Sequence, residues 1–291
     1  MVFVHGSGPQ DRDETIGPNK VFKDLAHRLA QRGISTLRYE KRTREWGLLF
    51  ASKLANWTVD DEVVDDAIEA LRSASKATGL NNAGPLFLLG HSEGAYLAPR
   101  IAEAAERQGI AVAGVIMLAP PITPLYDLAL QQARHILATQ PSEALSKDLE
   151  RSERSREVLL DALKSEEPSV AGSNLAPLPL GWPLSAWRDL AKYDPAAVLK
   201  RMTRTPALLM FFGDDYQVPA SEMELWRQRL SERGDTTFSP LPGVNHILTD
   251  GPNHRVPADY DRPASISPLL IDVVATFVRG ISDRAINASG P

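Results

Sequence analysis

Ser92 stands in a pattern that is typical of a nucleophilic serine. The residues around it fit Gly-x-Ser-x-Gly, with Gly90 and Gly94 at the two glycine positions. Such a serine sits on a sharp turn between a strand and a helix, where larger residues would clash. The apolar run at residues 86–89 and the helical pattern after the serine supply that setting. The pattern therefore predicts a nucleophile elbow in preference to an ordinary structural turn.

A serine hydroxyl needs a base to take its proton, and the base needs an acid to orient it. Three histidines follow Ser92 in the chain: His135, His246 and His254. We favour His246 as the base, because it lies in a turn-rich loop just after the last expected strand. His135 falls within an expected helix and is more simply a surface or packing residue. His254 lies farther along, in a polar loop.

The orienting acid is expected in the loop that follows the strand at residues 207–212. This loop contains both Asp214 and Asp215. Neighbouring side chains at the end of a strand point in different directions, so only one of the two can face the base. Position alone leaves the two aspartates open.

The oxyanion of an acyl-transfer reaction needs two fixed N–H donors. One is expected from the backbone of Glu93, the residue after the serine. The other is expected from the glycine-containing loop at residues 5–9, after the first strand, where Ser7 is favoured and Gly8 is next. His5 is expected to pack and brace this loop without a catalytic role.

Short apolar runs alternate with helical patterns along the chain, which indicates an α/β fold with a mostly parallel sheet flanked by helices. The expected strands are residues 2–4, 34–39, 85–89, 112–118, 207–212 and 236–240. The expected helices of this part of the fold are residues 19–32, 59–76, a segment from the serine to about 107, and 266–279.

Residues 121–204 interrupt this alternation with a stretch that is rich in proline and charge. A connection of this length is far longer than a normal loop between a strand and a helix. Helices are expected at residues 125–139 and 142–165. We interpret the stretch as a helical cap inserted into a core formed by residues 1–120 and 205–291.

The apolar side chains of this cap are candidates for lining an acyl pocket. They include Leu125, Leu128, Trp182 and Trp187. Packing of the cap onto the core is the alternative role for the same residues, and the sequence does not separate the two. The cap is not strongly amphipathic, which favours small to medium acyl groups.

Composition excludes several classes of protein. The chain of 291 residues has no cysteine, which excludes disulfides, thiolate zinc sites, iron–sulfur clusters and a cysteine nucleophile. A net charge of -5 argues against nucleic acid or an anionic membrane as a partner. No apolar run reaches the roughly 18 residues of a membrane span. No signal peptide precedes Val2, so a cytoplasmic protein is expected, and no motif calls for a cofactor or a metal.

Taken together, these motifs resemble the α/β-hydrolase superfamily, and in particular bacterial serine esterases of the dienelactone-hydrolase and acyl-peptidase-like branch. The resemblance covers nearly the whole chain and rests on residues 5–14, 37–43, 90–94, 193–195, 215–219 and 245–246. Its Asp-Tyr-Gln-Val segment favours Asp215 over Asp214 as the acid.

The resemblance implies hydrolysis of small-molecule carboxylic esters through an acyl-enzyme, carried out by Ser92, Asp215 and His246 without a cofactor. A peptidase, a lactonase or a thioesterase with the same triad is an alternative. A non-catalytic binding module is a more distant alternative, because such proteins usually lack a triad member and here all three are present.

The start of the chain departs from the superfamily pattern. The strand before the first loop motif is normally the third, so the first two usual strands are missing and the cap follows the fourth strand of this chain. Residues 34–39 would then lie at an open edge, and an apolar unpaired edge favours pairing with another chain. A homodimer through this edge, or a sequence cut short at its start, is expected. In the second case the missing signal peptide carries little weight.

Overall fold

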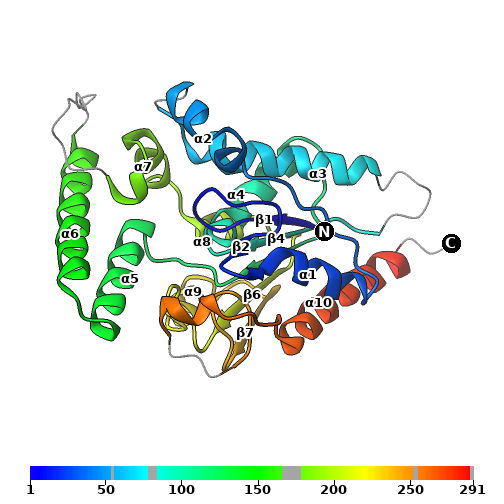
Figure 1. Ribbon diagram of the computed structural model, residues 1–291. Helices are drawn as coiled ribbons and strands as arrows, with labels where there is room; N and C mark the ends of the chain where they lie inside the picture. The colour runs from blue at the N-terminus through cyan, green and yellow to red at the C-terminus, as the bar shows by residue number, and fades with distance from the viewer. Residues whose placement is uncertain (54–55, 78–83, 166–177, 252–254, 289–291) are drawn as a thin grey trace.

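A five-stranded parallel sheet forms the centre of the computed structural model, which describes residues 1–53, 56–77, 84–165, 178–251 and 255–288 (Figure 1). The strand order is β1-β4-β5-β6-β7, and every neighbouring pair is parallel. The strands are β1 (Val2–Val4), β4 (Phe87–His91), β5 (Gly114–Leu118), β6 (Ala207–Phe212) and β7 (Thr236–Leu241). A separate antiparallel hairpin pairs β2 (Thr15–Ile16) with β3 (Asn19–Lys20).

Helices cover both faces of this sheet. On one face lie α3 (Asp65–Ala77) and α4 (Glu93–Arg107), which contact each other and β1. On the other face α10 (Pro268–Ala288) contacts β5 and β7, and α1 (Val21–Ala30) packs beside it. Because β4, β5 and β6 are covered on both sides, they are continuous apolar runs without an alternating polar face.

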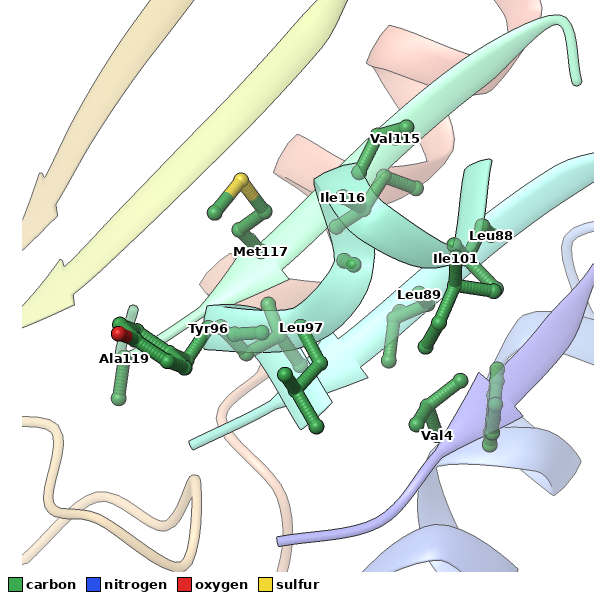
Figure 2. Close-up of a cluster of buried hydrophobic side chains, with 14 of the residues drawn as sticks. Val4, Leu88, Leu89, Tyr96, Leu97, Ile101, Val115, Ile116, Met117 and Ala119 are labelled. Carbon is green, nitrogen blue, oxygen red and sulfur yellow. The ribbon is translucent and has the colours of Figure 1, made fainter. Parts of the chain in front are cut away.

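The core between α4 and the sheet is closely filled by aliphatic side chains (Figure 2). Leu97 and Ile101 of α4 lie over Leu89 of β4, near Val4 of β1. All four side chains are fully buried. This packing fixes the helix that starts directly after Ser92, and so fixes the turn that carries the serine.

The segment between β5 and β6 is helical, as the sequence indicates. It contains α5 (Leu125–Thr139), α6 (Glu143–Lys164), the short 3-10 turn η2 (Pro179–Gly181), α7 (Leu184–Leu190) and α8 (Pro195–Arg201). Helices α5 and α6 pack side by side, away from the sheet, whereas α8 packs on α4 (Figure 1). The division of the chain into a core and a cap stays a prediction.

Other parts of the fold have no counterpart among the expected elements. They are α2 (Arg42–Lys53), η2, α7, α8, α9 (Glu222–Arg229), the 3-10 turn η3 (Pro257–Asp261) and the hairpin of β2 and β3. The helix expected at residues 59–76 begins as a π-helical turn, η1 (Asp60–Val64), and continues as α3. The Asp61 carboxylate accepts hydrogen bonds from the Thr58 hydroxyl at 2.9 Å and the Thr58 N–H at 2.8 Å, which caps this start.

The strand expected at residues 34–39 is wrong for most of its length. Only Leu37 pairs with the sheet, as a single parallel bridge to Val2. Leu37 donates to the Met1 carbonyl at 2.8 Å and accepts from the Phe3 N–H at 3.1 Å. β1 pairs over three residues with β4 on its other side, whereas residues 34–39 meet it through this one bridge. A homodimer through this edge stays a prediction.

The loops that carry the expected site residues all follow the carboxyl ends of parallel strands. Residues 5–9 follow β1, Ser92 follows β4, Asp215 follows β6 and His246 follows β7. Parallel strands bring these ends to one edge of the sheet, where α/β folds bind ligands. Across the described residues, no helix combines the length and the apolar character that a bilayer crossing requires.

Candidate active site

Ser92 occupies a strained turn between β4 and α4. Its backbone has φ 53° and ψ -115°, which side-chain-bearing residues rarely adopt. A β-carbon at Gly94 would lie 2.6 Å from the carbonyl oxygen of His5 and closer still to that of Val4. A β-carbon at Gly90 would overlap the backbone of Gly94. Only glycine fits at both places, so the Gly-x-Ser-x-Gly spacing has a direct steric cause.

The aspartate and the histidine of the expected triad are in contact. The Nδ1 of His246 lies 2.6 Å from the Oδ2 of Asp215. The other oxygen, Oδ1, accepts the N–H groups of Gln217 at 2.7 Å and Val218 at 2.9 Å. The carboxyl group of Asp215 is fully buried, so these contacts hold it in one orientation. With Nδ1 donating to the carboxylate, the neutral ring presents Nε2 as an acceptor.

Asp214 points away from this contact. Its carboxylate pairs with the Arg255 guanidinium at 3.2 Å on the exposed side of the loop. Of the two neighbouring aspartates, Asp215 is the one that touches His246, and its role as the orienting acid stays a prediction.

Ser92 and His246 line one pocket together with Ser7 and Glu93, the two expected oxyanion donors. The pocket has a volume of about 130 Å³. Its other lining residues are Gly6, Gln10, Glu14, Ile16, His91, Leu125, Leu128, Ala129, Gln132, Leu180 and Gln217. Gly8, the second choice for the oxyanion loop, is not among them.

Two of the four expected pocket residues lie elsewhere. Leu125 and Leu128 of α5 line the pocket. Trp182 is buried between the rings of Trp57 and Trp187, at centroid distances of 5.7 and 5.1 Å. Trp187 lines a different cavity, next to Tyr126. The two indoles pack against other aromatic rings and do not line the pocket of Ser92. Packing was the alternative role that the sequence left open for them.

His135 and His5 lie apart from the Asp215–His246 pair. The Nε2 of His135 contacts the Arg255 carbonyl at 2.6 Å on an exposed face, and its ring stacks on Tyr216. His254 lies outside the described residues. His5 is buried between the rings of Phe22 and Tyr39, and burial lowers its pKa to about 4. A neutral, packed ring fits the bracing role expected for His5.

A buried pair links the loop after β1 to the loop of His246. The Glu14 carboxylate accepts the Gly6 N–H at 2.7 Å through Oε1 and contacts the Nδ1 of His91 at 3.1 Å through Oε2. The Nε2 of His91 lies 2.9 Å from the carbonyl oxygen of His246. Both ring nitrogens of His91 face acceptors, so each carries a hydrogen and the ring is an imidazolium.

The electrostatics of this pair agree with that protonation. Burial alone would lower the pKa of His91, but the Glu14 carboxylate raises it above its ordinary value. Burial alone would raise the pKa of Glu14, but His91 lowers it. The ion pair thus holds the backbone of the histidine that contacts Asp215.

A second buried cluster joins Glu93, the residue after Ser92, to the loop after β1. The Lys41 ammonium contacts Glu93 Oε2 at 3.2 Å, Glu62 Oε1 at 3.3 Å and the Gly6 carbonyl oxygen at 3.2 Å. Burial raises the pKa of Glu93 to about 7, an effect that Lys41 opposes and Glu62 reinforces. Burial alone would lower the pKa of Lys41, but the two carboxylates raise it. The Lys41 ammonium is therefore shared by the carboxylates of Glu62 and Glu93, which are both buried.

We expect this cluster to make stability depend on pH. The pKa of Glu93 is raised in the folded state from its ordinary value of 4.5 to about 7. Its contribution to the free energy of unfolding is therefore fully present below pH 4.5 and is lost as the pH rises through about 7. Glu93→Gln removes that titration. The melting temperature of the variant relative to the wild type should therefore rise between about pH 5.5 and about pH 8. Thermal unfolding at both pH values measures it, and a difference that stays constant or falls would contradict the assignment.

Glu14, Lys41, Glu62 and His91 are not among the site residues that the sequence predicts. Three of them lie in segments that carry the resemblance, at residues 5–14, 37–43 and 90–94. A charged residue next to such a motif is an available signal, but a single sequence does not show which charges are buried. Across the described residues, no group of three or more His, Asp or Glu side chains is arranged to hold a metal ion.

Comparisons with known proteins identify the family and the fold of the chain. Esterase EstD of Thermotoga maritima is 36% identical over 284 residues, which cover 96% of this chain. The chain spans 61% of the length of that relative. Among solved structures, Est1E from Butyrivibrio proteoclasticus with bound ferulic acid has a TM-score of 0.51 at 14% identity, covering 96% of this chain and 87% of its own.

The Pyrococcus furiosus esterase PF2001 also has a TM-score of 0.51, at 15% identity, covering 97% of this chain and 81% of its own. These two likenesses show the fold. The alpha/beta hydrolase family model matches residues 1–262, which is most of the sequence. With the parallel sheet, the serine turn and the Asp–His contact already described, the chain belongs to the alpha/beta hydrolase family.

Proposed function

We propose that this protein is a serine hydrolase that cleaves carboxylic esters of small to medium acyl groups through an acyl-enzyme intermediate. The observation that carries the proposal is the 2.6 Å contact between Asp215 and His246, in a pocket that Ser92 and His246 line together. Similarity to Esterase EstD over 96% of the chain supports ester hydrolysis. No cofactor enters the proposed reaction.

In the proposed reaction, the Oγ of Ser92 attacks the ester carbonyl carbon while the Nε2 of His246 takes the hydroxyl proton. The carbonyl oxygen becomes an oxyanion, which the N–H groups of Ser7 and Glu93 stabilise. Collapse of this intermediate breaks the bond to the alcohol, which leaves with the proton from His246. Asp215 keeps the imidazole in the required tautomer and stabilises its charged form.

Deacylation repeats the same steps with water. His246 takes a proton from water, the hydroxide attacks the acyl-enzyme, and a second oxyanion forms in the same place. Its collapse releases the carboxylic acid and returns the proton to the Oγ of Ser92. Ser92 is the N-cap of α4, whose N-terminal dipole further favours the negative charge.

The size of the pocket sets the expected substrate range. A volume of about 130 Å³ is well below the roughly 300–1,000 Å³ of pockets that hold drug-sized ligands. We expect kcat/KM to be at least about tenfold higher for p-nitrophenyl acetate or butyrate than for the dodecanoate. A steady-state panel that includes an amide, a lactone and a thioester measures this. If the amide, the lactone or the thioester were preferred over every p-nitrophenyl ester, the protein would be assigned as a peptidase, a lactonase or a thioesterase, respectively.

A matched pair of variants in α5 tests the place of the acyl group. Leu128 lines the pocket, whereas Leu130 is buried in the same helix and does not line it. Leu128→Ala should shift the preference toward longer acyl chains, and Leu130→Ala should leave the ranking as it is. If both variants changed the ranking in the same way, the acyl group would not lie against Leu128.

A further inference from the structure

The two backbone polar groups of Gly6 are held by buried charged residues, one on the His5–Gly6 peptide and the other on the Gly6–Ser7 peptide. The N–H of Gly6 donates to the Glu14 carboxylate at 2.7 Å, and its carbonyl oxygen accepts from the Lys41 ammonium at 3.2 Å. Glu14 and Lys41 are 1% and 2% exposed, so water does not compete for either contact. A buried charge without partners is unfavourable, and both residues therefore keep these hydrogen bonds.

We propose that Lys41 is a positioning residue that orients the Ser7 N–H toward the oxyanion, with Glu14 holding the peptide that precedes it. The inference rests on the proposed function and deepens it, since it assigns what holds one of the two donors in place.

The geometry of a trans peptide connects Lys41 to that donor. The carbonyl of Gly6 and the N–H of Ser7 belong to one planar unit and point in opposite directions. No cis peptide is present among the described residues. Holding the Gly6 oxygen on the side of Lys41 therefore turns the Ser7 N–H to the other side. Ser7 lines the pocket together with Ser92.

The positive charge also strengthens the donor. An ammonium at the carbonyl oxygen polarises the peptide, and hydrogen bonds in such a chain reinforce one another where water is excluded. The Ser7 N–H is therefore both aimed and made more acidic by the same contact. A neutral residue at position 41 would supply neither effect.

Lys41 joins the two expected oxyanion donors through one atom. Its Nζ contacts the side chain of Glu93, whose backbone N–H is the second donor, and it contacts the carbonyl of Gly6, which adjoins the first. Glu14 extends the connection through His91 to the carbonyl of His246. These buried side chains thus connect the serine turn, the oxyanion loop and the loop of His246.

The test compares Lys41→Met with Arg42→Met. Both variants replace a cation by methionine at adjacent positions, but Arg42 pairs with Asp66 at 2.8 Å, apart from the Gly6 peptide. For p-nitrophenyl butyrate, Lys41→Met should lower kcat by about 10- to 100-fold with KM nearly unchanged, because the lost interaction develops in the transition state. Arg42→Met should stay within about twofold of the wild type.

Inhibition by a trifluoromethyl ketone separates positioning from a structural role. Its adduct with Ser92 carries an oxyanion, so Lys41→Met should weaken its inhibition by the same factor as kcat/KM falls. A fall in kcat with unchanged inhibition, or no fall in kcat in the folded variant, would overturn the proposal. If Lys41→Met does not fold, the double variant Lys41→Met, Glu62→Gln is used, because it also removes a carboxylate that Lys41→Met leaves without its partner. The same kinetic and inhibition measurements are made on the double variant.

The outcome is distinguishable from failure of the proposed function. If Ser92→Ala were inactive while Lys41→Met kept full activity and inhibitor affinity, the esterase assignment would stand and the positioning role would fall. If Ser92→Ala kept the activity, the assignment itself would fall.

Discussion

Ser92→Ala should reduce the hydrolysis of p-nitrophenyl butyrate by a factor on the order of 10⁴ to 10⁶, which is the largest effect expected in this protein. The variant keeps the pocket and the Asp215–His246 contact but removes the oxygen that attacks the ester. Without it no acyl-enzyme forms, and only oxyanion stabilisation of attack by water remains. The initial rate of p-nitrophenol release, measured over the range of substrate concentration, gives the loss directly.

The fold should survive this substitution. Alanine also carries a β-carbon, so it meets the same strain at φ 53° as serine does. The melting temperature of Ser92→Ala should match that of the wild type within a few degrees. A fluorophosphonate should label the wild type at the peptide that contains Ser92 and should not label the variant. Turnover that persists in Ser92→Ala refutes the nucleophile, and an unlabelled wild type favours a non-catalytic binding module.

Asp215→Asn should lower kcat by a factor on the order of 10⁴. The Asp215 carboxylate accepts from the Nδ1 of His246 at 2.6 Å and has no contact with water. An amide at this position can turn its NH₂ group toward the ring, which moves the hydrogen to Nε2 and removes the acceptor that Ser92 needs. Steady-state kinetics across a range of pH measures the loss.

Asp214→Asn is the matched control for this variant. It makes the same chemical change one residue away, at a carboxylate whose partner is the half-exposed Arg255. An exposed pair of this kind contributes roughly 0–1 kcal/mol to stability, so activity should stay near that of the wild type. If Asp214→Asn were the inactive variant and Asp215→Asn the active one, the assignment of the acid would be reversed.

The sheet and the serine turn could be predicted because their causes are local. The apolar runs of β4, β5 and β6 stand out in the sequence, and the two glycines beside Ser92 leave few other structures open. The order of the chain then placed His246 after the last strand. The choice between Asp214 and Asp215 was different, since it depended on resemblance until the contact with His246 separated them.

What the sequence did not reveal depends on burial between distant segments. Lys41 and Glu93 are separated by 52 positions, and Glu14 and His91 by 77. Each of these residues is polar and, taken alone, suits the surface. For Trp182 and Trp187 the prediction was wrong in the opposite sense, since they were expected in the pocket and instead pack on each other. A large apolar side chain in a cap can line a pocket or pack against another ring. Only the tertiary arrangement distinguishes these possibilities.

The contact between Gly94 and the carbonyls of Val4 and His5 divides the protein into parts with different tolerance to redesign. At this contact two backbones meet without intervening side chains, so a methyl group would push the serine turn away from the end of β1. The pocket wall that Leu125 and Leu128 of α5 form is not part of that contact. A library meant to broaden the range of accepted acids is therefore best confined to this wall, with Gly94 left as it is.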